Sequence, residues 1–244
     1  MSSPRIAAIG DVHGRSDLLA RLLADVERAW RADRVVLLGD YIDRGPDSRG
    51  VLEVLLDARL QWGPRVVCVR GNHEDWFLDT VRGESSPRGW LTAMEGLATV
   101  RSYAPDVADE FARAIAERRP RDHYVAAFAA FVRERFPPAH LRLLESLGTH
   151  HVEAGAIFVH AGLAPLVPLE RQDPRDLTHI GRAFVERYEG PETVIFGHMD
   201  AGALRGDGLA LPYVGANRIV GLDTSSAGVL TAYLWPDGDV LQVR

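Results

Sequence analysis

Short apolar runs, each ending in a glycine and a polar residue, recur along the chain. They are 5–11 (RIAAIGD), 34–40 (RVVLLGD), 65–72 (RVVCVRGN), 156–162 (AIFVHAG) and 193–198 (TVIFGH). Runs of this length, rich in β-branched residues, are typical of buried strands. The chain therefore has at least five predicted strands that end in chemically similar ways.

Two segments whose apolar residues have helical spacing lie between the first three runs. The apolar positions with this spacing are Leu18, Leu19, Leu22, Leu23 and Val26 in the first segment, and Val51, Val54 and Leu55 in the second. Such stripes indicate amphipathic helices packed on a core. Alternating strands and helices predict an α/β fold whose sites lie at the carboxyl ends of the strands.

The stretch from about 73 to 147 lacks a strand pattern and contains several helical segments, including 90–104 and 124–136, broken by prolines at 87, 105, 120, 137 and 138. The strand pattern resumes after it with the same kind of ending. We therefore predict a helical insert within a single domain that spans residues 1–244. The last segment, 218–244, is typical of antiparallel strands joined by a PDGD turn.

Composition and charge narrow the class of protein. The chain has 244 residues, of which 46% are hydrophobic and 25% charged, as in an ordinary globular domain. A net charge of −6 argues against nucleic acid as a partner. No run approaches 18 apolar residues, and the start shows no signal-peptide pattern, so we expect a cytoplasmic protein without a membrane partner.

Two residue types exclude particular chemistries. All 28 basic residues are arginine, which rules out lysine Schiff bases and a Walker A lysine. Cys68 is the one cysteine, so disulfides within the chain and cysteine-based zinc sites are excluded. Its apolar surroundings predict a buried thiol.

Acidic and imidazole side chains follow the first two predicted strands. Asp11 and His13 stand two positions apart, so an extended strand end projects both to one side, where they could hold a divalent metal. Taken alone, the pentapeptide GDVHG (10–14) that contains them is as well explained by a turn and a helix cap. Asp40 ends the neighbouring strand, and two facing carboxylates repel unless one is protonated or a cation lies between them.

Three more potential ligands follow later strands. They are Asn72, His160 and His198. Each histidine alone is most simply a hydrogen-bonded loop residue, but five strand ends that all present oxygen or imidazole predict a metal site. Carboxylate, amide and imidazole ligands suit manganese, with iron or zinc as alternatives. Six ligands fit two divalent ions that share Asp40, about 3.5 to 4 Å apart.

The segments GDVHG (10–14), GDYIDRG (39–45), GNHE (71–74), HAG (160–162) and GH (197–198), in this order, resemble the signature of calcineurin-like metallophosphoesterases. The likeness is to the PPP-type serine/threonine phosphatases and their bacterial and phage relatives, over about residues 6–233. It implies a four-layer αββα sandwich. It also implies one metal held by Asp11, His13 and Asp40, and a second held by Asp40, Asn72, His160 and His198.

A mechanism follows from this arrangement. A hydroxide bridging the two metals is nucleophilic at neutral pH and would attack phosphorus in line. Arg44 would hold two phosphate oxygens and stabilise the transition state. His73, charged when paired with Asp43, would protonate the leaving oxygen.

The predicted activity is hydrolysis of phosphoserine and phosphothreonine in proteins, with phosphotyrosine and small aryl phosphates as further substrates. One alternative is hydrolysis of dinucleoside polyphosphates such as diadenosine tetraphosphate. Another is a metal-stabilised binding module without catalysis. The Asp43, Arg44 and His73 constellation argues against that last alternative, because a binding module has no need of an acid beside a phosphate clamp.

The sequence departs from the family pattern at two points. Gly181 stands where bacterial members carry a second phosphate-binding arginine, and Arg182 follows it, turned by roughly 100 degrees if helical. Met199 replaces the more usual threonine after His198, where it could change the hydrogen bonding of that ligand.

The other polar residues are assigned structural roles. Glu74 is expected to brace the helix after GNH, Asp47 to cap a helix, and Asp223 to form a turn. The histidines at 123, 140, 150, 151 and 179 are expected to be surface residues in helices or turns.

Overall fold

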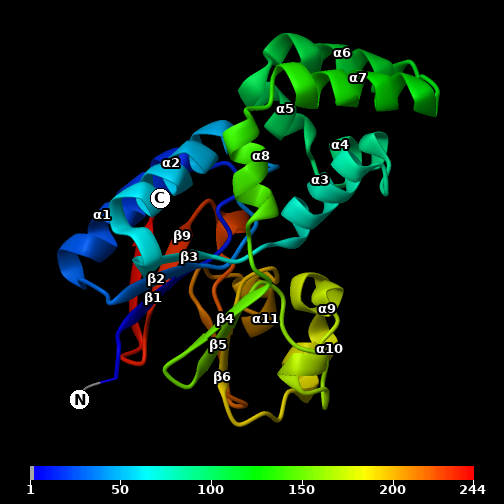
Figure 1. Ribbon diagram of the computed structural model, residues 1–244. Helices are drawn as coiled ribbons and strands as arrows, with labels where there is room; N and C mark the ends of the chain where they lie inside the picture. The colour runs from blue at the N-terminus through cyan, green and yellow to red at the C-terminus, as the bar shows by residue number, and fades with distance from the viewer. Residues whose placement is uncertain (1–2) are drawn as a thin grey trace.

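The computed structural model describes residues 3–244, and its strands form two mixed five-stranded sheets (Figure 1). The first sheet has the order β10-β9-β1-β2-β3, and the second has the order β4-β5-β6-β8-β7. The strands are β1 (Ile6–Ile9), β2 (Arg34–Leu37), β3 (Val66–Cys68), β4 (His150–Glu153), β5 (Ala156–Val159), β6 (Thr193–Phe196), β7 (Tyr213–Gly215), β8 (Ile219–Gly221), β9 (Leu230–Trp235) and β10 (Asp239–Val243). The five strands predicted from the apolar runs are all present.

Helices flank both sheets. They are α1 (Ser16–Ala29), α2 (Ser48–Trp62), α3 (Asn72–Arg82), α4 (Pro87–Ala93), α5 (Leu97–Tyr103), α6 (Pro105–Ala116), α7 (Arg121–Glu134), α8 (Pro138–Glu145), α9 (Pro174–His179), α10 (Arg182–Arg187) and α11 (Ala201–Arg205). Short 3₁₀ turns occupy Gly63–Arg65, Leu169–Arg171 and Ser225–Ala227. No helix among residues 3–244 is long and apolar enough to cross a bilayer.

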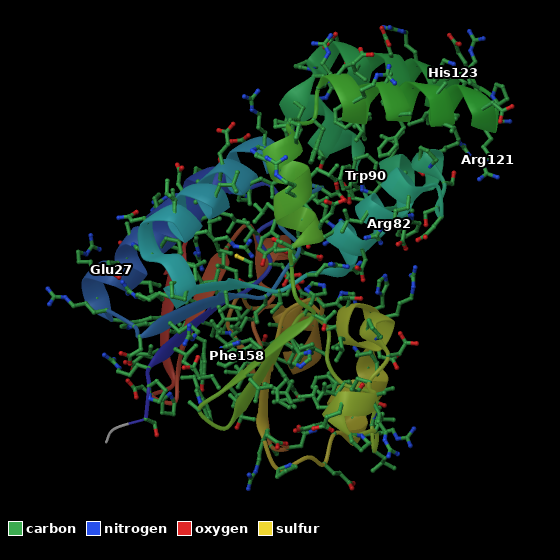
Figure 2. The ribbon with its side chains drawn as sticks, in the orientation of Figure 1. Glu27, Arg82, Trp90, Arg121, His123 and Phe158 are labelled. Atoms are coloured by element: carbon green, nitrogen blue, oxygen red, sulfur yellow. The ribbon has the colours of Figure 1, made fainter. Side chains whose placement is uncertain are left out.

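Alternating side chains of each central strand build three apolar layers. In β1, Ile6 and Ala8 pack between the sheets, whereas Ala7 and Ile9 pack under the flanking helices. Phe158 of β5 fills the middle layer from the second sheet (Figure 2). Both faces of β1 and β5 are covered, so these two strands are buried and apolar throughout. This is the predicted αββα sandwich, with α9 and α10 on the outer face of the second sheet.

Residues 73–147 form helices α3 to α8, and α6 and α7 project away from the sheets as a pair (Figure 1). Proline begins α4, α6 and α8, where its missing N–H costs no hydrogen bond. The continuous helix expected over 90–104 is two helices instead. A β-carbon on Gly96 would lie 2.3 Å from the Trp90 ring, so the chain turns there over the indole.

The C-terminal segment is only partly as predicted. β9 and β10 form the antiparallel hairpin, with the turn at residues 236–238. β8, however, joins the second sheet in parallel with β6. Because β8 lies in the second sheet, its end faces the end of β1. The loop after β8, residues 222–229, therefore contributes to the site.

Candidate dinuclear metal site

The carboxyl ends of five strands that carry predicted ligands meet between the two sheets. Asp11, Asp40 and Asn72 follow β1, β2 and β3 of the first sheet, and His160 and His198 follow β5 and β6 of the second. Parallel strands place these ends at one edge, as the sequence predicted. Asp11, Asp40 and His160 are fully buried, whereas Asn72 and His198 are half-buried.

His13, Asp40 and His73 form one group of potential ligands, with atoms that lie within 4.8 Å of one another. His13 Nε2 is 3.5 Å from Asp40 Oδ2. The Nδ1 hydrogen of His13 donates to the Ile42 carbonyl at 3.1 Å, which leaves a lone pair on Nε2. In this structure Arg44 Nη1 donates to that lone pair at 3.0 Å.

Asp40, His160 and His198 form the second group. His160 donates from Nδ1 to the Leu38 carbonyl at 2.8 Å, so its Nε2 also carries a lone pair. That atom lies 2.9 Å from Asn72 Oδ1 and 3.4 Å from Asp40 Oδ1. Asn72 Oδ1 is in turn 3.1 Å from His198 Nδ1. Asp40 thus belongs to both groups.

The charges of the site fit a pair of divalent cations. The lone pairs of Asp40, Asn72 and His160 face one another, and a bound cation would remove the repulsion between them. Burial raises the pKa of Asp11 and of Asp40 well above the usual carboxyl range, and nearby carboxylates raise both further. A bound metal would offset this cost. Oxygen and imidazole donors without thiolate suit manganese, iron or zinc.

Asp11 lies outside both groups, although it is buried beside them. Both of its carboxylate oxygens accept from the His198 backbone N–H at 3.0 Å. This contact ties the end of β1 to the loop after β6 across the two sheets. Asp11 as a metal ligand therefore remains a prediction from the sequence.

Glu74 does more than brace its own helix. The carboxylate accepts backbone N–H groups from Gly71 and Asp40 at 2.9 Å, from Tyr41 at 2.8 Å and from Ile42 at 3.2 Å. It is fully buried, and burial raises its pKa to about 7. Glu74 therefore clamps the loop after β2 to the start of α3, the two segments that carry Asp40 and Asn72.

The backbone of the site is strained. Five of the nine predicted site residues have positive φ, namely His13, Asp40, Asp43, Arg44 and His198. A non-glycine residue adopts this conformation only where its surroundings impose it, and such residues concentrate at functional sites. A β-carbon on Gly71 would lie 2.1 Å from Asp40 Oδ1, so the third strand end must carry glycine to approach the second.

Asp43 and His73 form a buried pair, as predicted. His73 Nδ1 lies 2.9 Å from Asp43 Oδ2, and both side chains are fully buried. Two residues of the insert hold the same carboxyl. Thr99 Oγ1 donates to Oδ1 at 2.6 Å, and Trp90 Nε1 donates to Oδ2 at 3.0 Å. Figure 2 shows Trp90 on α4, so helices α4 and α5 anchor the pair from outside the sandwich.

Burial favours the uncharged form of this pair. It raises the pKa of Asp43 to about 8 and lowers the pKa of His73 to about 3. At neutral pH the carboxyl proton then lies between Asp43 and Nδ1, and the imidazole carries its other hydrogen on Nε2. That nitrogen is buried without a partner among the described residues, 3.8 Å from Asp40 Oδ2. The expected charged His73 is thus not the favoured state, although the pair holds a donatable proton.

Several residues that the sequence assigned to the surface lie elsewhere. His140 is buried, and its Nδ1 is 2.6 Å from the Tyr103 hydroxyl. His150 and His151 belong to β4 and not to a helix or turn. His179 is close enough to the site for its charge to lower the pKa of both His73 and His198.

The last loop adds a carboxylate that the sequence analysis treated as a turn residue. Asp223 follows β8, is buried, and accepts from the Ser225 N–H at 2.9 Å, so the turn role is correct. Its charge also raises the pKa of Asp11, so it belongs electrostatically to the site. The signal that could have identified it is the apolar run before it, which ends as the other site strands end.

The two departures from the family pattern lie on the second-sheet side of the molecule. Gly181 has open space around it, and Arg182 begins α10 with an exposed side chain. Arg182 makes no hydrogen bond or ion pair within residues 3–244, so its role as a second phosphate clamp stays a question from the sequence. Met199 packs against the outer apolar layer of the second sheet.

Comparison with known proteins agrees with this geometry. A segment of 83 residues is 41% identical to serine/threonine-protein phosphatase 1 of Salmonella typhimurium, covering 34% of this chain and 35% of that protein. A segment of 102 residues is 33% identical to the symmetrical bis(5'-nucleosyl)-tetraphosphatase of Dechloromonas aromatica, covering 42% of this chain and 34% of that one. Each match thus spans about a third of the curated relative.

The fold has solved counterparts. A metallophosphoesterase from Sphaerobacter thermophilus superposes with a TM-score of 0.51 at 19% identity, over 100% of this chain and 89% of that one. Residues 4–202 match the family model for calcineurin-like phosphoesterases, which is well over half of the chain. The chain therefore belongs to the calcineurin-like phosphoesterase family, metal-dependent hydrolases that act on phosphoester bonds.

Proposed function

We propose that this protein is a dinuclear phosphomonoesterase that removes phosphate from phosphoserine and phosphothreonine in proteins. The observation that carries the proposal is the Asp43–His73 pair beside Asp40, with Arg44 at the same loop. A proton donor, a phosphate-binding cation and two groups of metal-ligating side chains then surround one point. The relative that is itself a serine/threonine-protein phosphatase supports the choice of substrate.

The predicted ligands are Asp11, His13 and Asp40 for one metal, and Asp40, Asn72, His160 and His198 for the other. When bound, divalent metals at such sites lower the pKa of water and stabilise charge on phosphoryl oxygens. Manganese is the proposed metal, with iron or zinc as alternatives.

The chain's own residues then do three things. Arg44 exchanges its hydrogen bond to His13 for two phosphoryl oxygens, which its planar guanidinium binds bidentately. His73 donates its Nε2 proton to the leaving oxygen, and the proton held with Asp43 replaces it on Nδ1. Trp90 and Thr99 hold the Asp43 carboxyl in position against His73 during that transfer.

A substrate panel tests the proposal. With manganese present, phosphate release from phosphothreonine and phosphoserine peptides is expected to exceed nucleotide release from diadenosine tetraphosphate by at least about tenfold in kcat/KM. The reverse order would replace the proposal with dinucleoside polyphosphate hydrolysis, the activity named for the Dechloromonas aromatica relative. Metal-loaded protein that binds phosphopeptides and hydrolyses nothing in the panel would support the binding module instead.

His73→Ala tests the proton donor separately. It is expected to lower turnover by about two orders of magnitude or more while the metal content is unchanged. His123→Ala is the matched control, because His123 lies exposed at the outer end of the α6–α7 pair (Figure 2). Turnover of the His73 variant equal to that of the control would remove His73 from the mechanism.

A further inference from the structure

A hollow of about 260 Å³ opens directly beside the candidate metal site. Asp11, His13 and Arg44 line it on the side of the site, and Arg15 and Gly228 line it on the other. None of the predicted ligands from β2, β3, β5 or β6 lines it. The hollow therefore adjoins the site on the side of Asp11, His13 and Arg44 and extends beyond it to Arg15.

Arg15 is held in place by its backbone, while its guanidinium is left free. Its N–H donates to the Val12 carbonyl at 3.2 Å, and its carbonyl accepts from Leu19 at 3.0 Å. Its side chain is 36% exposed, and its Nε lies 4.0 Å from the carboxylate of Asp17, which is 68% exposed. An ion pair of this length and exposure contributes little. No hydrogen bond to the guanidinium is made within residues 3–244, so its donors are available.

The Gly228 turn provides the surface on which Arg15 rests. A β-carbon on Gly228 would lie 3.8 Å from Arg15 Nη1, and the φ of Gly228 is +68°. Two carboxylates near this wall are hydrogen-bonded to its serines, because Asp223 accepts from Ser225 and Asp200 accepts from Ser226. Both serines line the hollow, whereas neither acid does.

Two guanidinium groups and one carboxylate, that of Asp11, therefore line one small space in a chain of net charge −6. Apolar side chains from α1 and β9, Leu18 and Leu230, also line it. The volume lies below the roughly 300 to 1,000 Å³ of pockets that enclose a whole drug-sized ligand. A single carboxylate or phosphate group fits this size and charge better than a nucleoside does.

We propose that this hollow, the Arg15 subsite, binds a second anionic group that the substrate carries next to its scissile phosphate. Arg44 holds the scissile phosphate, and Arg15 holds the second anion on the far side of the hollow. The inference rests on the proposed phosphoesterase function and adds a specificity to it. The anion is either an acidic side chain beside the phosphorylated residue or the next phosphate of a polyphosphate chain.

The experiment compares the wild type with Arg15→Gln on two matched substrate series under manganese. The first series is a phosphothreonine peptide with flanking glutamates and the same peptide with flanking glutamines. The second is diadenosine tetraphosphate and p-nitrophenyl phosphate. In each series the readout is the ratio of the two kcat/KM values, so that a general loss of activity cancels.

The wild type is expected to prefer the more anionic member of one series by about tenfold, the lower end of what a hydrogen bond to a charged group contributes. Arg15→Gln should abolish that preference, mainly through KM. Arg28→Gln, an equal loss of charge at the far end of α1 where the side chain is 78% exposed, should retain it. Arg15→Lys keeps the charge but not the planar guanidinium that binds two oxygens at once, so this variant should retain part of the preference.

The two series distinguish the two possible anions. They also distinguish a failure of the Arg15 subsite from a failure of the proposed function. Loss of the preference among peptides assigns an acidic side chain, and loss of the preference for the tetraphosphate assigns a phosphate chain. If no phosphopeptide is hydrolysed, the proposed protein substrate fails while the second series still tests the subsite. A wild-type preference below twofold in both series, or an equal loss in Arg28→Gln, overturns the Arg15 subsite.

Discussion

The hydrogen bond from Thr99 to Asp43 offers a direct test of how the helical insert supports the proposed chemistry. Thr99 lies on α5, is fully buried, and donates to Asp43 Oδ1 at 2.6 Å. Its oxygen also accepts the Asp43 backbone N–H at 2.9 Å. Thr99→Val replaces the hydroxyl with a methyl group of similar size, so the change removes hydrogen bonds and leaves little cavity.

The expected magnitude follows from the group that loses its partner. Leaving a buried polar group without its hydrogen-bond partner costs about 1 to 3 kcal/mol, and the Asp43 carboxyl is fully buried. The Asp43 N–H keeps a second acceptor in Ser48 Oγ at 3.1 Å, so the groups that lose a partner are the carboxyl and the Ser48 hydroxyl, which lies 3.0 Å from Thr99 Oγ1. We expect a loss of about 2 kcal/mol in the free energy of unfolding. If the same energy orients Asp43 for His73, kcat falls about 10- to 100-fold.

The assay is steady-state hydrolysis of p-nitrophenyl phosphate with saturating manganese, together with the metal content of the purified variant. Thr99 contacts none of the predicted ligands, so metal content and KM should change by less than about twofold, whereas kcat falls. Thr92→Val is the matched control, because that exposed hydroxyl on α4 donates to the Arg88 carbonyl and not to the pair. A kcat for Thr99→Val within threefold of this control would refute the positioning role.

Three further changes probe the neighbouring supports. Glu74→Gln should cost about 3 kcal/mol of unfolding free energy by urea denaturation, because the amide nitrogen would face backbone N–H groups that now donate to a carboxylate; an unchanged midpoint would contradict the clamp. Gly71→Ala should lower metal content and activity together, since its β-carbon would overlap Asp40, whereas Gly181→Ala, with open space, should change neither. Trp90→Phe should lower kcat about tenfold through the lost indole N–H, and a rate equal to wild type would remove that bond from the account.

The strand ends could be predicted because each carries a local signal. An apolar run predicts a buried strand, and a polar residue after it lies at the sheet edge where parallel strands end. This is why Asp40, Asn72 and His160 are found together. The resemblance to a known family then supplied the layer order, which periodicity alone does not determine.

The supports of the site could not be predicted because they depend on distant parts of the chain. Trp90 and Thr99 reach Asp43 across 47 and 56 residues, from helices whose packing no local pattern reveals. The same holds for His140, which the fold buries against Tyr103 although its local sequence is typical of a surface helix. The break at Gly96 in the predicted helix has a local cause instead, because the chain there passes too close to the Trp90 ring for a side chain to fit.

The central claim is that Asp40 is shared by two metals whereas Asp43, three residues later, serves the proton donor. Elemental analysis of the wild type, Asp40→Asn and Asp43→Asn, each purified with manganese, tests it most directly. We expect about two metals per chain in the wild type, most of the metal lost in Asp40→Asn, and both metals retained with slow turnover in Asp43→Asn. Equal metal content in all three proteins, or loss of metal from Asp43→Asn alone, would contradict it.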